Sequence, residues 1–226
     1  MLAVSTTDEW RNAHPGAVIG LLELSSLANQ DPAGALAALK RATEERLRSR
    51  YAGSVRTDLL ALPVLAAYDR YYRRFNKTYH VLLQLESIVM KGKNLAAISP
   101  LVDAYFIAEM ETLVLTAGHD IAKLTEPLLI DVSRDDDRMT RMTGESRTIR
   151  AGDMIMRDAE GVSCSIIYGQ DDHSPISAAT TAALFVAYAP AGVGEEQVER
   201  QLRAIEEHVR LFSPGAAVEQ HRTIAA

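Results

Sequence analysis

The chain has 226 residues and a formal net charge of −6, with 47% hydrophobic and 24% charged residues. This predicts a soluble globular chain with a substantial core, as one domain or two intimate lobes, and no apolar stretch approaches the ~18 residues of a membrane span. The acidic balance argues against a general nucleic-acid binder, and the single cysteine, Cys164, excludes an internal disulfide and a zinc site built from cysteines.

The first segment, residues 1–15, carries acidic and polar side chains where a secretory signal needs a basic start and an apolar run. Together with the lone Cys164, which we expect to be buried in a strand, this predicts a cytoplasmic location. Residues 16–24 (GAVIGLLEL) are apolar and bounded by turn residues, which predicts a buried strand.

Helices are expected to dominate the rest of the first half. Asp31 is a good N-cap with Pro32 at the first helical position, which predicts a helix through Arg50. Further helices are predicted over residues 63–75, 79–90 and 101–113. Gly92 is the expected stop of the helix over 79–90.

Strands are expected in the second half, at residues 127–132, in a short hairpin around Gly144, and at 153–157, 162–168 and 182–188. The last helix, 195–212, has one apolar stripe and three i,i+4 Glu–Arg pairs, each worth roughly 0.2–0.5 kcal/mol. The tail from Gly215 is predicted to be loose. Helices gathered before strands favour the α+β class over an alternating βαβ sheet.

Basic residues and aromatic residues alternate between positions 70 and 93. Arg and Lys supply salt-sensitive attraction to phosphates, and exposed aromatic rings stack on unpaired bases such as those of a tRNA acceptor end. The alternative is an amphipathic helix whose aromatic residues lie in the core and whose arginines are merely solvated. The candidate RNA-binding residues are Arg73, Arg74, Lys77, Lys91 and Lys93.

Residues 99–120 (SPLVDAYFIAEMETLVLTAGHD) form the most informative segment. It opens with a Ser-Pro pair, reads as one apolar helix, and stops at Gly118, which leaves His119 and Asp120 on a turn. The segment resembles the B3/B4 module of the phenylalanyl-tRNA synthetase β subunit, in which N-N-V-V-D-V-T-N-Y opens a helix of the same length before a histidine-containing turn, an Asp and a Lys-Leu. The two Asp positions fall at Asp103 and Asp120, and the Lys-Leu recurs at Lys123-Leu124.

The resemblance is closer still to free-standing B3/B4 proteins and covers roughly residues 60–190. The family's D-x-V-x-A-D-x-x-G element corresponds to residues 153–161, and its V-M-G-G loop corresponds to residues 167–170. It implies a single three-layer α+β domain over residues 1–226. It also implies a trans-acting hydrolase that deacylates mischarged aminoacyl-tRNA with water, has the aminoacylated 3′ end of tRNA as its partner, and needs no cofactor or metal.

The same resemblance implies the site residues. His119 and Asp120 are the catalytic candidates. The implied substrate pocket consists of Tyr105, Phe106, Ala117, Tyr168, Gly169 and Val186.

Two departures from the family pattern affect specificity. The synthetase has a pocket histidine where this chain has Ala117, and the imidazole appears two residues later as His119. Val186 falls where the synthetase has a glutamate that binds the hydroxyl of misloaded tyrosine. A site without that acceptor loses its means of selecting a hydroxyl, so a small or apolar amino acid is expected rather than tyrosine. A non-catalytic module that binds tRNA or an amino acid is the alternative function.

Other chemistry receives little support. The chain contains no serine nucleophile elbow, HExxH or CxxC motif. His119 is alternatively a helix-capping residue, and for Asp103 and Asp120 a structural role as helix or turn caps is favoured over a catalytic role. The run Asp171-Asp172-His173 is read as a solvated loop, with an oxygen-rich metal site beside His119 as the less favoured alternative.

Overall fold

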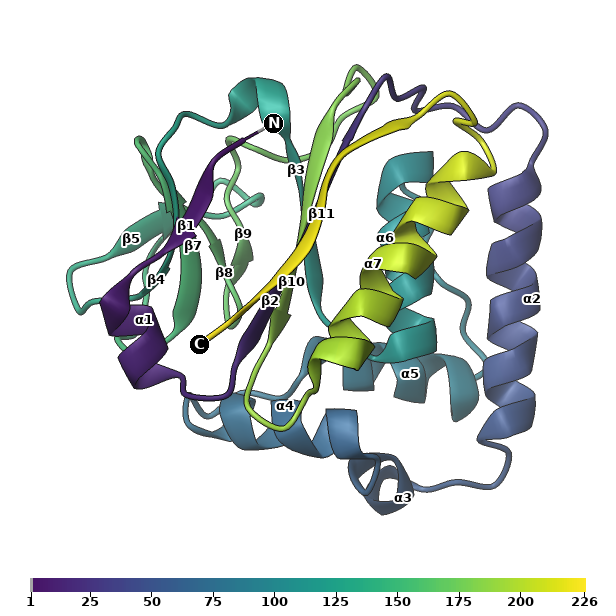
Figure 1. Cartoon of the computed structure of the whole chain (residues 1–226). Helices are drawn as coiled ribbons and strands as arrows, with labels where there is room; N and C mark the ends of the chain where they lie inside the picture. The colour runs from purple at the N-terminus through teal and green to yellow at the C-terminus, as the bar shows by residue number, and fades with distance from the viewer. Residues whose placement is uncertain (1) are drawn as a thin grey trace.

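The computed structural model describes residues 2–226, which form three layers: an outer sheet, a central sheet and a layer of helices (Figure 1). The α+β class and the three-layer arrangement expected from the sequence are confirmed. None of the helices in the described part of the chain is long and apolar enough to cross a bilayer. In chain order the elements are β1 (Val4–Thr6), α1 (Asp8–Ala13), β2 (Val18–Ser25), α2 (Ala35–Arg50), α3 (Arg56–Leu60), α4 (Pro63–Arg73), α5 (His80–Val89), α6 (Pro100–Thr112), β3 (Thr116–Asp120), the 3₁₀ turn η1 (Ile121–Lys123), β4 (Leu128–Val132), β5 (Arg138–Thr140), β6 (Ser146–Thr148), β7 (Met154–Asp158), β8 (Gly161–Ser165), β9 (Gly169–Gln170), β10 (Ala183–Ala189), α7 (Glu195–Arg210) and β11 (Ala217–Ala225).

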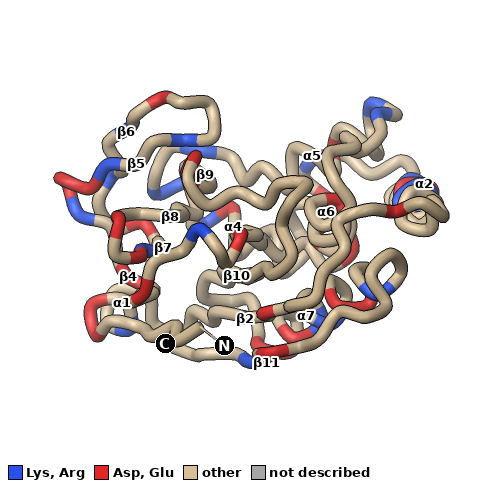
Figure 2. Tube along the Cα trace, turned by 90° about the horizontal axis from the view of Figure 1, so that it is seen from above, with Lys and Arg blue, Asp and Glu red and all other residues tan. Residues whose placement is uncertain are grey.

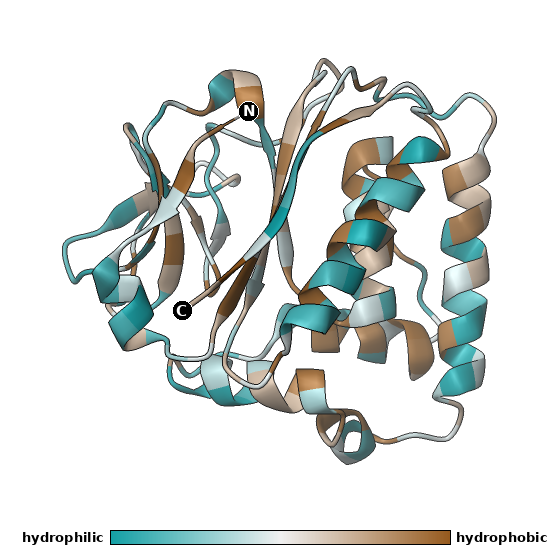
Figure 3. Ribbon diagram, viewed as in Figure 1, coloured by the Kyte–Doolittle hydropathy of each residue, from teal (hydrophilic) through white to brown (hydrophobic). Residues whose placement is uncertain are grey.

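The central sheet has the order β11-β2-β10-β3 and is antiparallel throughout. Helices α6 and α7 cover one of its faces, with their apolar sides turned inward (Figure 3). Gly20 on β2 permits the close approach of α7, because a β-carbon there would lie 2.5 Å from Val198 Cγ1. A side chain at this position would force the helix off the sheet.

The outer sheet has the order β1-β4-β7-β8-β9 and covers the other face of the central sheet. The two sheets are tied by polar contacts, such as Gln170 Nε2 donating to the Gly118 carbonyl at 2.9 Å. β5 and β6 form the hairpin predicted around Gly144, whose φ of +78° suits a glycine. The strand order of the central sheet makes β3 one of its two edge strands.

The predicted last helix is confirmed as α7, and its three i,i+4 pairs are present. The N···O distances are 3.3 Å for Glu196–Arg200, 3.9 Å for Glu199–Arg203 and 2.8 Å for Glu206–Arg210. The prediction of a loose tail after Gly215 is wrong. Residues 217–225 form β11, which pairs along the whole of β2 and gives that strand its second neighbour.

One further sequence prediction needs correction, and three short elements were missed. Helix α2 begins at Ala35 rather than at Pro32, because Gly34 takes a left-handed conformation at the N-cap. Asp31 still caps the helix from the preceding turn, with its carboxylate accepting from the N–H groups of Ala35 and Leu36 at 3.0 Å each. The short elements β1, α1 and α3 were not predicted, since three to six residues carry too little periodicity to detect.

Candidate functional site

Three of the pocket residues implied by the family resemblance are divided between the two faces of the central sheet. Val186 on β10 is opposite Ala117 on β3, and Phe185 is opposite Gly118. The Phe185 ring packs 5.8 Å from that of Tyr105 on α6, so this pair faces the helices. Because side chains alternate along a strand, Ala117 and Val186 face the outer sheet instead. The structure therefore does not bring Tyr105 and Val186 into one cavity.

His119 lies within β3 and not on a turn, so the predicted stop at Gly118 is wrong. α6 ends at Thr112, where Leu113 takes a left-handed conformation, and the chain then enters the strand. Gly118 is required inside the strand, because a β-carbon there would lie 2.8 Å from Ile176 Cδ1 and 3.0 Å from Tyr105 Cε1. The apolar run thus contains a helix and a buried strand, two structures that hydrophobicity alone does not separate.

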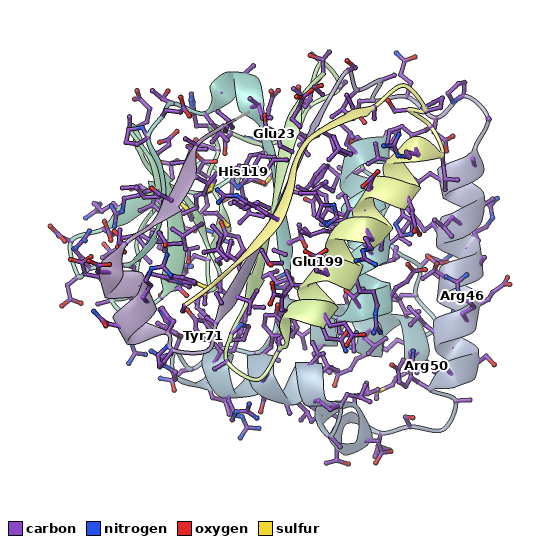
Figure 4. All side chains as sticks on the ribbon, viewed as in Figure 1. Glu23, Arg46, Arg50, Tyr71, His119 and Glu199 are labelled. Carbon is purple, nitrogen blue, oxygen red and sulfur yellow. The ribbon has the colours of Figure 1, made fainter. Side chains whose placement is uncertain are left out.

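The His119 imidazole is fully buried between the two sheets, where Figure 4 labels it. Its Nδ1 lies 2.7 Å from the Ser174 hydroxyl, which in turn donates to Asp171 Oδ1 at 2.6 Å. Gln170 Nε2 lies 3.1 Å from the same Nδ1, while Nε2 of the imidazole has no partner among the described residues. Burial lowers the pKa of His119 to about 3, so the ring is neutral near pH 7.

The side chains of Asp120 and Asp103 have structural roles, as acceptors of backbone and side-chain hydrogen bonds. The Asp120 carboxylate accepts from the Ala122 N–H at 3.1 Å and from the Thr180 hydroxyl at 2.7 Å. Asp103 accepts from the Ile98 N–H at 3.0 Å and pairs with Lys40 at 2.6 Å. Both carboxylates are thereby committed to holding the ends of β3 and α6.

Tyr168 and Gly169 belong to a different part of the molecule from Phe106. They follow β8, and the Tyr168 ring packs on a small apolar cluster beside the β5–β6 hairpin. The Tyr168 carbonyl accepts from Arg141 Nε at 3.2 Å, and the Arg147 guanidinium lies 5.4 Å from the ring centroid. Gly169 takes a φ of +87° where the chain turns into β9.

An open pocket lies at the edge of the central sheet, between α5, α6 and the first residue of β3. It has a volume of about 360 Å³. We name it the β3-edge pocket, and its lining residues are His80, Leu83, Gln84, Ser87, Phe106, Glu109 and Thr116. Of the residues implied by the sequence, Phe106 lies in this pocket, and Ala117 directly follows its lining residue Thr116.

Glu109 is the chemically distinctive residue of the β3-edge pocket. Its Oε1 accepts from the Thr116 N–H at 2.7 Å, and no hydrogen bond to Oε2 is made within residues 2–226. Burial raises the pKa of Glu109 from 4.5 to about 8, against a smaller opposing effect of the Thr116 hydrogen bond. A carboxyl group with this pKa exchanges its proton near neutral pH, which is the property of a general acid or base.

Sequence reasoning did not select Glu109, although a signal was present. It follows Tyr105 by four residues and Phe106 by three, and so continues an apolar face of α6. A glutamate at such a position has to be buried, neutralised or paired, and a buried ionisable group is a candidate functional residue.

The candidate tRNA-binding residues are exposed but form two groups. Arg73, Arg74 and Lys77 lie at the end of α4, whereas Lys91 and Lys93 lie at the far end of α5 beside α2. Figure 2 shows Lys and Arg spread around the trace and mixed with Asp and Glu. The two groups bracket α5, one wall of the β3-edge pocket, at its start and at its end.

The aromatic residues of the same region are buried and do not form an exposed stacking platform. The rings of Tyr68 and Tyr79 stack at 4.1 Å, and their hydroxyls donate to the carbonyls of Tyr188 and Leu113. Tyr72 donates to the Ile166 carbonyl at 2.7 Å. The alternative reading, in which the aromatic residues belong to the core, therefore holds for these tyrosines.

Within residues 2–226, no group of three or more His, Cys, Asp or Glu side chains is placed to hold a metal ion. Cys164 is buried on β8, as expected. Burial raises the pKa of its thiol to about 12, so the thiolate that reacts or binds metals is not populated near pH 7.

Comparison with known proteins identifies a similar solved structure and a matching family. The chain is similar over its whole length to an N-terminal fragment of the phenylalanyl-tRNA synthetase beta-subunit from Pyrococcus horikoshii, with a TM-score of 0.51 and 8% identity, and it spans 55% of that fragment. At this identity the likeness shows the fold alone. No curated protein matches the sequence. The B3/4 domain family matches residues 66–221, and the chain belongs to that family.

Proposed function

We propose that the protein is a trans-acting editing hydrolase that hydrolyses the ester bond of mischarged aminoacyl-tRNA. The observation that carries this proposal is Glu109, a carboxyl group with a pKa of about 8 on the wall of an open pocket. Membership of the B3/4 domain family and the fold shared with a synthetase β-subunit fragment support a substrate related to tRNA.

Ester hydrolysis in the β3-edge pocket requires few groups. A water bound to ionised Glu109 attacks the carbonyl carbon of the ester, and Glu109 accepts the proton of that water. The bond to the ribose oxygen then breaks, and the ribose hydroxyl leaves with the proton that Glu109 returns. Phe106 gives the pocket an apolar wall for the amino-acid side chain, and the Thr116 N–H fixes the orientation of the carboxyl group.

His119 and Asp120 enter this proposal as residues that fix β3 and do not contact the ester. The His119–Ser174–Asp171 chain ties the loop after β9 to β3, and Asp120 caps the turn at the end of the strand. β3 in turn places Thr116 at the pocket. Replacement of either residue would thus act through the position of β3.

A binding module without catalysis is the second candidate function. It is favoured by the full burial of His119 and Val186, two positions that the family resemblance assigned to the site. Such a module would retain tRNA or an amino acid and leave the ester intact.

A panel of mischarged tRNAs distinguishes the two functions and tests specificity. With Phe106 in the pocket and Val186 packed between the sheets, we expect faster loss of alanyl and valyl esters than of the tyrosyl ester. An apolar wall discriminates by only ~1–3 kcal/mol per methylene, so tolerance of several side chains is expected. A clear preference for tyrosyl-tRNA would contradict this specificity, and stability of every ester would favour the binding module.

Contact with tRNA is proposed to use the basic residues on either side of α5. Arg73→Glu combined with Lys77→Glu should weaken tRNA binding and reduce the slope of log Kobs against log salt by roughly 1.5, the effect of losing two phosphate contacts. Filter binding at several salt concentrations measures both. The Arg200→Glu and Arg203→Glu pair on α7 is the charge-matched control, and equal losses in the two double variants would contradict a specific contact.

A further inference from the structure

A second cleft lies below the two sheets, away from the β3-edge pocket. It has a volume of about 270 Å³ and shares no lining residue with that pocket. It is formed by α4, the α1–β2 connection and the β10–α7 connection, which come together at the lower edge of Figure 1. Its principal lining residues are His14, Ala67, Arg70, Tyr71, Arg74 and Pro190.

The cleft contains two arginines on one face of α4. Arg70 and Arg74 are four residues apart, so their side chains leave the helix in the same direction. Neither forms an ion pair with a carboxylate in the described part of the chain, in contrast to Arg73, which pairs with Asp69 at 2.7 Å. Both guanidinium charges of the cleft are therefore available to an anion.

Both arginines are exposed, and their guanidinium groups lie against the wall of the cleft. The Arg74 guanidinium lies over the rings of Tyr71 and Phe75, at 5.3 and 5.6 Å from their centroids. A β-carbon at Gly192 would lie 2.7 Å from Arg70 Nη2, so this glycine leaves the space that the guanidinium occupies. A guanidinium group that stacks on aromatic rings, as that of Arg74 does, loses little conformational freedom when it binds an oxyanion bidentately.

His14 supplies a polar group with no present partner. The residue is 5% exposed, and its ring makes no hydrogen bond within residues 2–226. Burial, and then the charge of Arg74, lower the pKa of His14 to about 4, so the ring is neutral near pH 7. A ligand oxygen or hydroxyl that pairs with this ring would offset the desolvation of its unpaired nitrogen.

Tyr71 forms the wall of the cleft and offers it no free hydroxyl. Its hydroxyl donates to Asp153 Oδ1 at 2.7 Å and accepts from the Met154 N–H at 2.6 Å. Figure 4 labels Tyr71 on the side of α4 that faces the outer sheet. The polar groups left for a ligand are thus two guanidinium groups and one neutral imidazole.

We propose that this cleft binds the terminal phosphate of a small phosphate monoester. Two guanidinium groups match the dianionic charge of a monoester, and the aromatic and apolar wall leaves room for the sugar or alkyl group that carries it. The protein has a net charge of −6, so retention of such a dianion requires this local positive charge. The proposal does not depend on the hydrolytic function of the β3-edge pocket.

Calorimetric titration at constant ionic strength tests the proposal with inorganic phosphate, ribose 5-phosphate and dimethyl phosphate as probes. We expect saturable binding of the first two and at least about tenfold weaker binding of the diester, a difference of about 1.4 kcal/mol. Arg70→Ala and Arg74→Ala should each weaken monoester binding by at least about tenfold. Preference for the diester would mean that the cleft reads a nucleic-acid backbone, and would overturn the monoester assignment.

Arg203→Ala is the control for loss of one positive charge, since Arg203 is an exposed arginine on α7 outside the cleft. It should bind phosphate like the unmodified protein. His14→Gln, which keeps a hydrogen-bonding group, should bind more tightly than His14→Phe, and circular dichroism confirms that each variant is folded. No saturable phosphate binding by the unmodified protein, or equal losses in the Arg70, Arg74 and Arg203 variants, would overturn the proposal.

Discussion

Replacing Glu109 by glutamine is expected to slow hydrolysis of mischarged tRNA by about 10²–10⁴-fold, the usual contribution of a general base. The amide oxygen of glutamine can still accept from the Thr116 N–H, which in the native protein lies 2.7 Å from Glu109 Oε1. The variant therefore keeps the pocket but loses the group that accepts a proton from water. Single-turnover deacylation of alanyl- or valyl-tRNA measures the difference.

The pH dependence of the rate provides a second readout. Because the pKa of Glu109 is raised to about 8, the native rate should increase with pH and level off above about 8, and this inflection should disappear in Glu109→Gln. Glu111→Gln, two residues further along α6, is the matched control, because Glu111 pairs with Arg46 outside the β3-edge pocket. Equal rates in the native and Glu109→Gln proteins would remove Glu109 from the mechanism.

The same substitution is expected to change stability in a pH-dependent manner. Between pH 4.5 and about 8 the glutamate is protonated in the folded protein and ionised in the unfolded chain. The unfolded state then binds fewer protons, so the free energy of unfolding falls as pH rises, by about 1.4 kcal/mol per pH unit from this group. Glu109→Gln removes this loss, and the variant should exceed the native protein in stability by several kcal/mol at pH 8.

Urea unfolding of both proteins from pH 5 to 9 measures this effect as a difference, which cancels the contributions of groups common to both. Those groups include His14 and His119, whose pKa values are lowered in the folded protein. Their contribution to the free energy of unfolding therefore decreases as the pH drops below 6.5, which is opposite to the effect of Glu109. Glu111→Gln again serves as the control, because the pKa of Glu111 is lowered and the group is ionised in both states over this range. Parallel curves for the native and Glu109→Gln proteins would show that Glu109 titrates normally.

Local sequence patterns were sufficient for the elements whose periodicity is long. The apolar stripe and Glu–Arg pairs of α7, the apolar run of β2, and the glycine turn between β5 and β6 all depend on neighbours within a few residues. The family resemblance rested on residues 99–120 and agreed with the fold. These features are local, so the sequence determines them without knowledge of distant contacts.

The strand at the C-terminal end and the boundary of α6 could be assigned only from the tertiary structure. β11 is polar at many positions and is ordered because β2 offers it an unpaired edge, a partner that lies almost 200 residues earlier in the chain. The segment after Leu113 is as apolar as the helix before it, and pairing with β10 decides that it becomes a strand. Apolar content alone does not separate the two outcomes.

The sequence by itself determined the α+β class, the family and the exposure of the basic residues around α5. Only the tertiary structure decided which side chains share a cavity. Alternation along β3 and β10 sends Val186 and Ala117 to one face of the central sheet and leaves Tyr105 on the other. Burial between α6 and β3, a property of the packed molecule, gives Glu109 its raised pKa, and no local pattern contains that information.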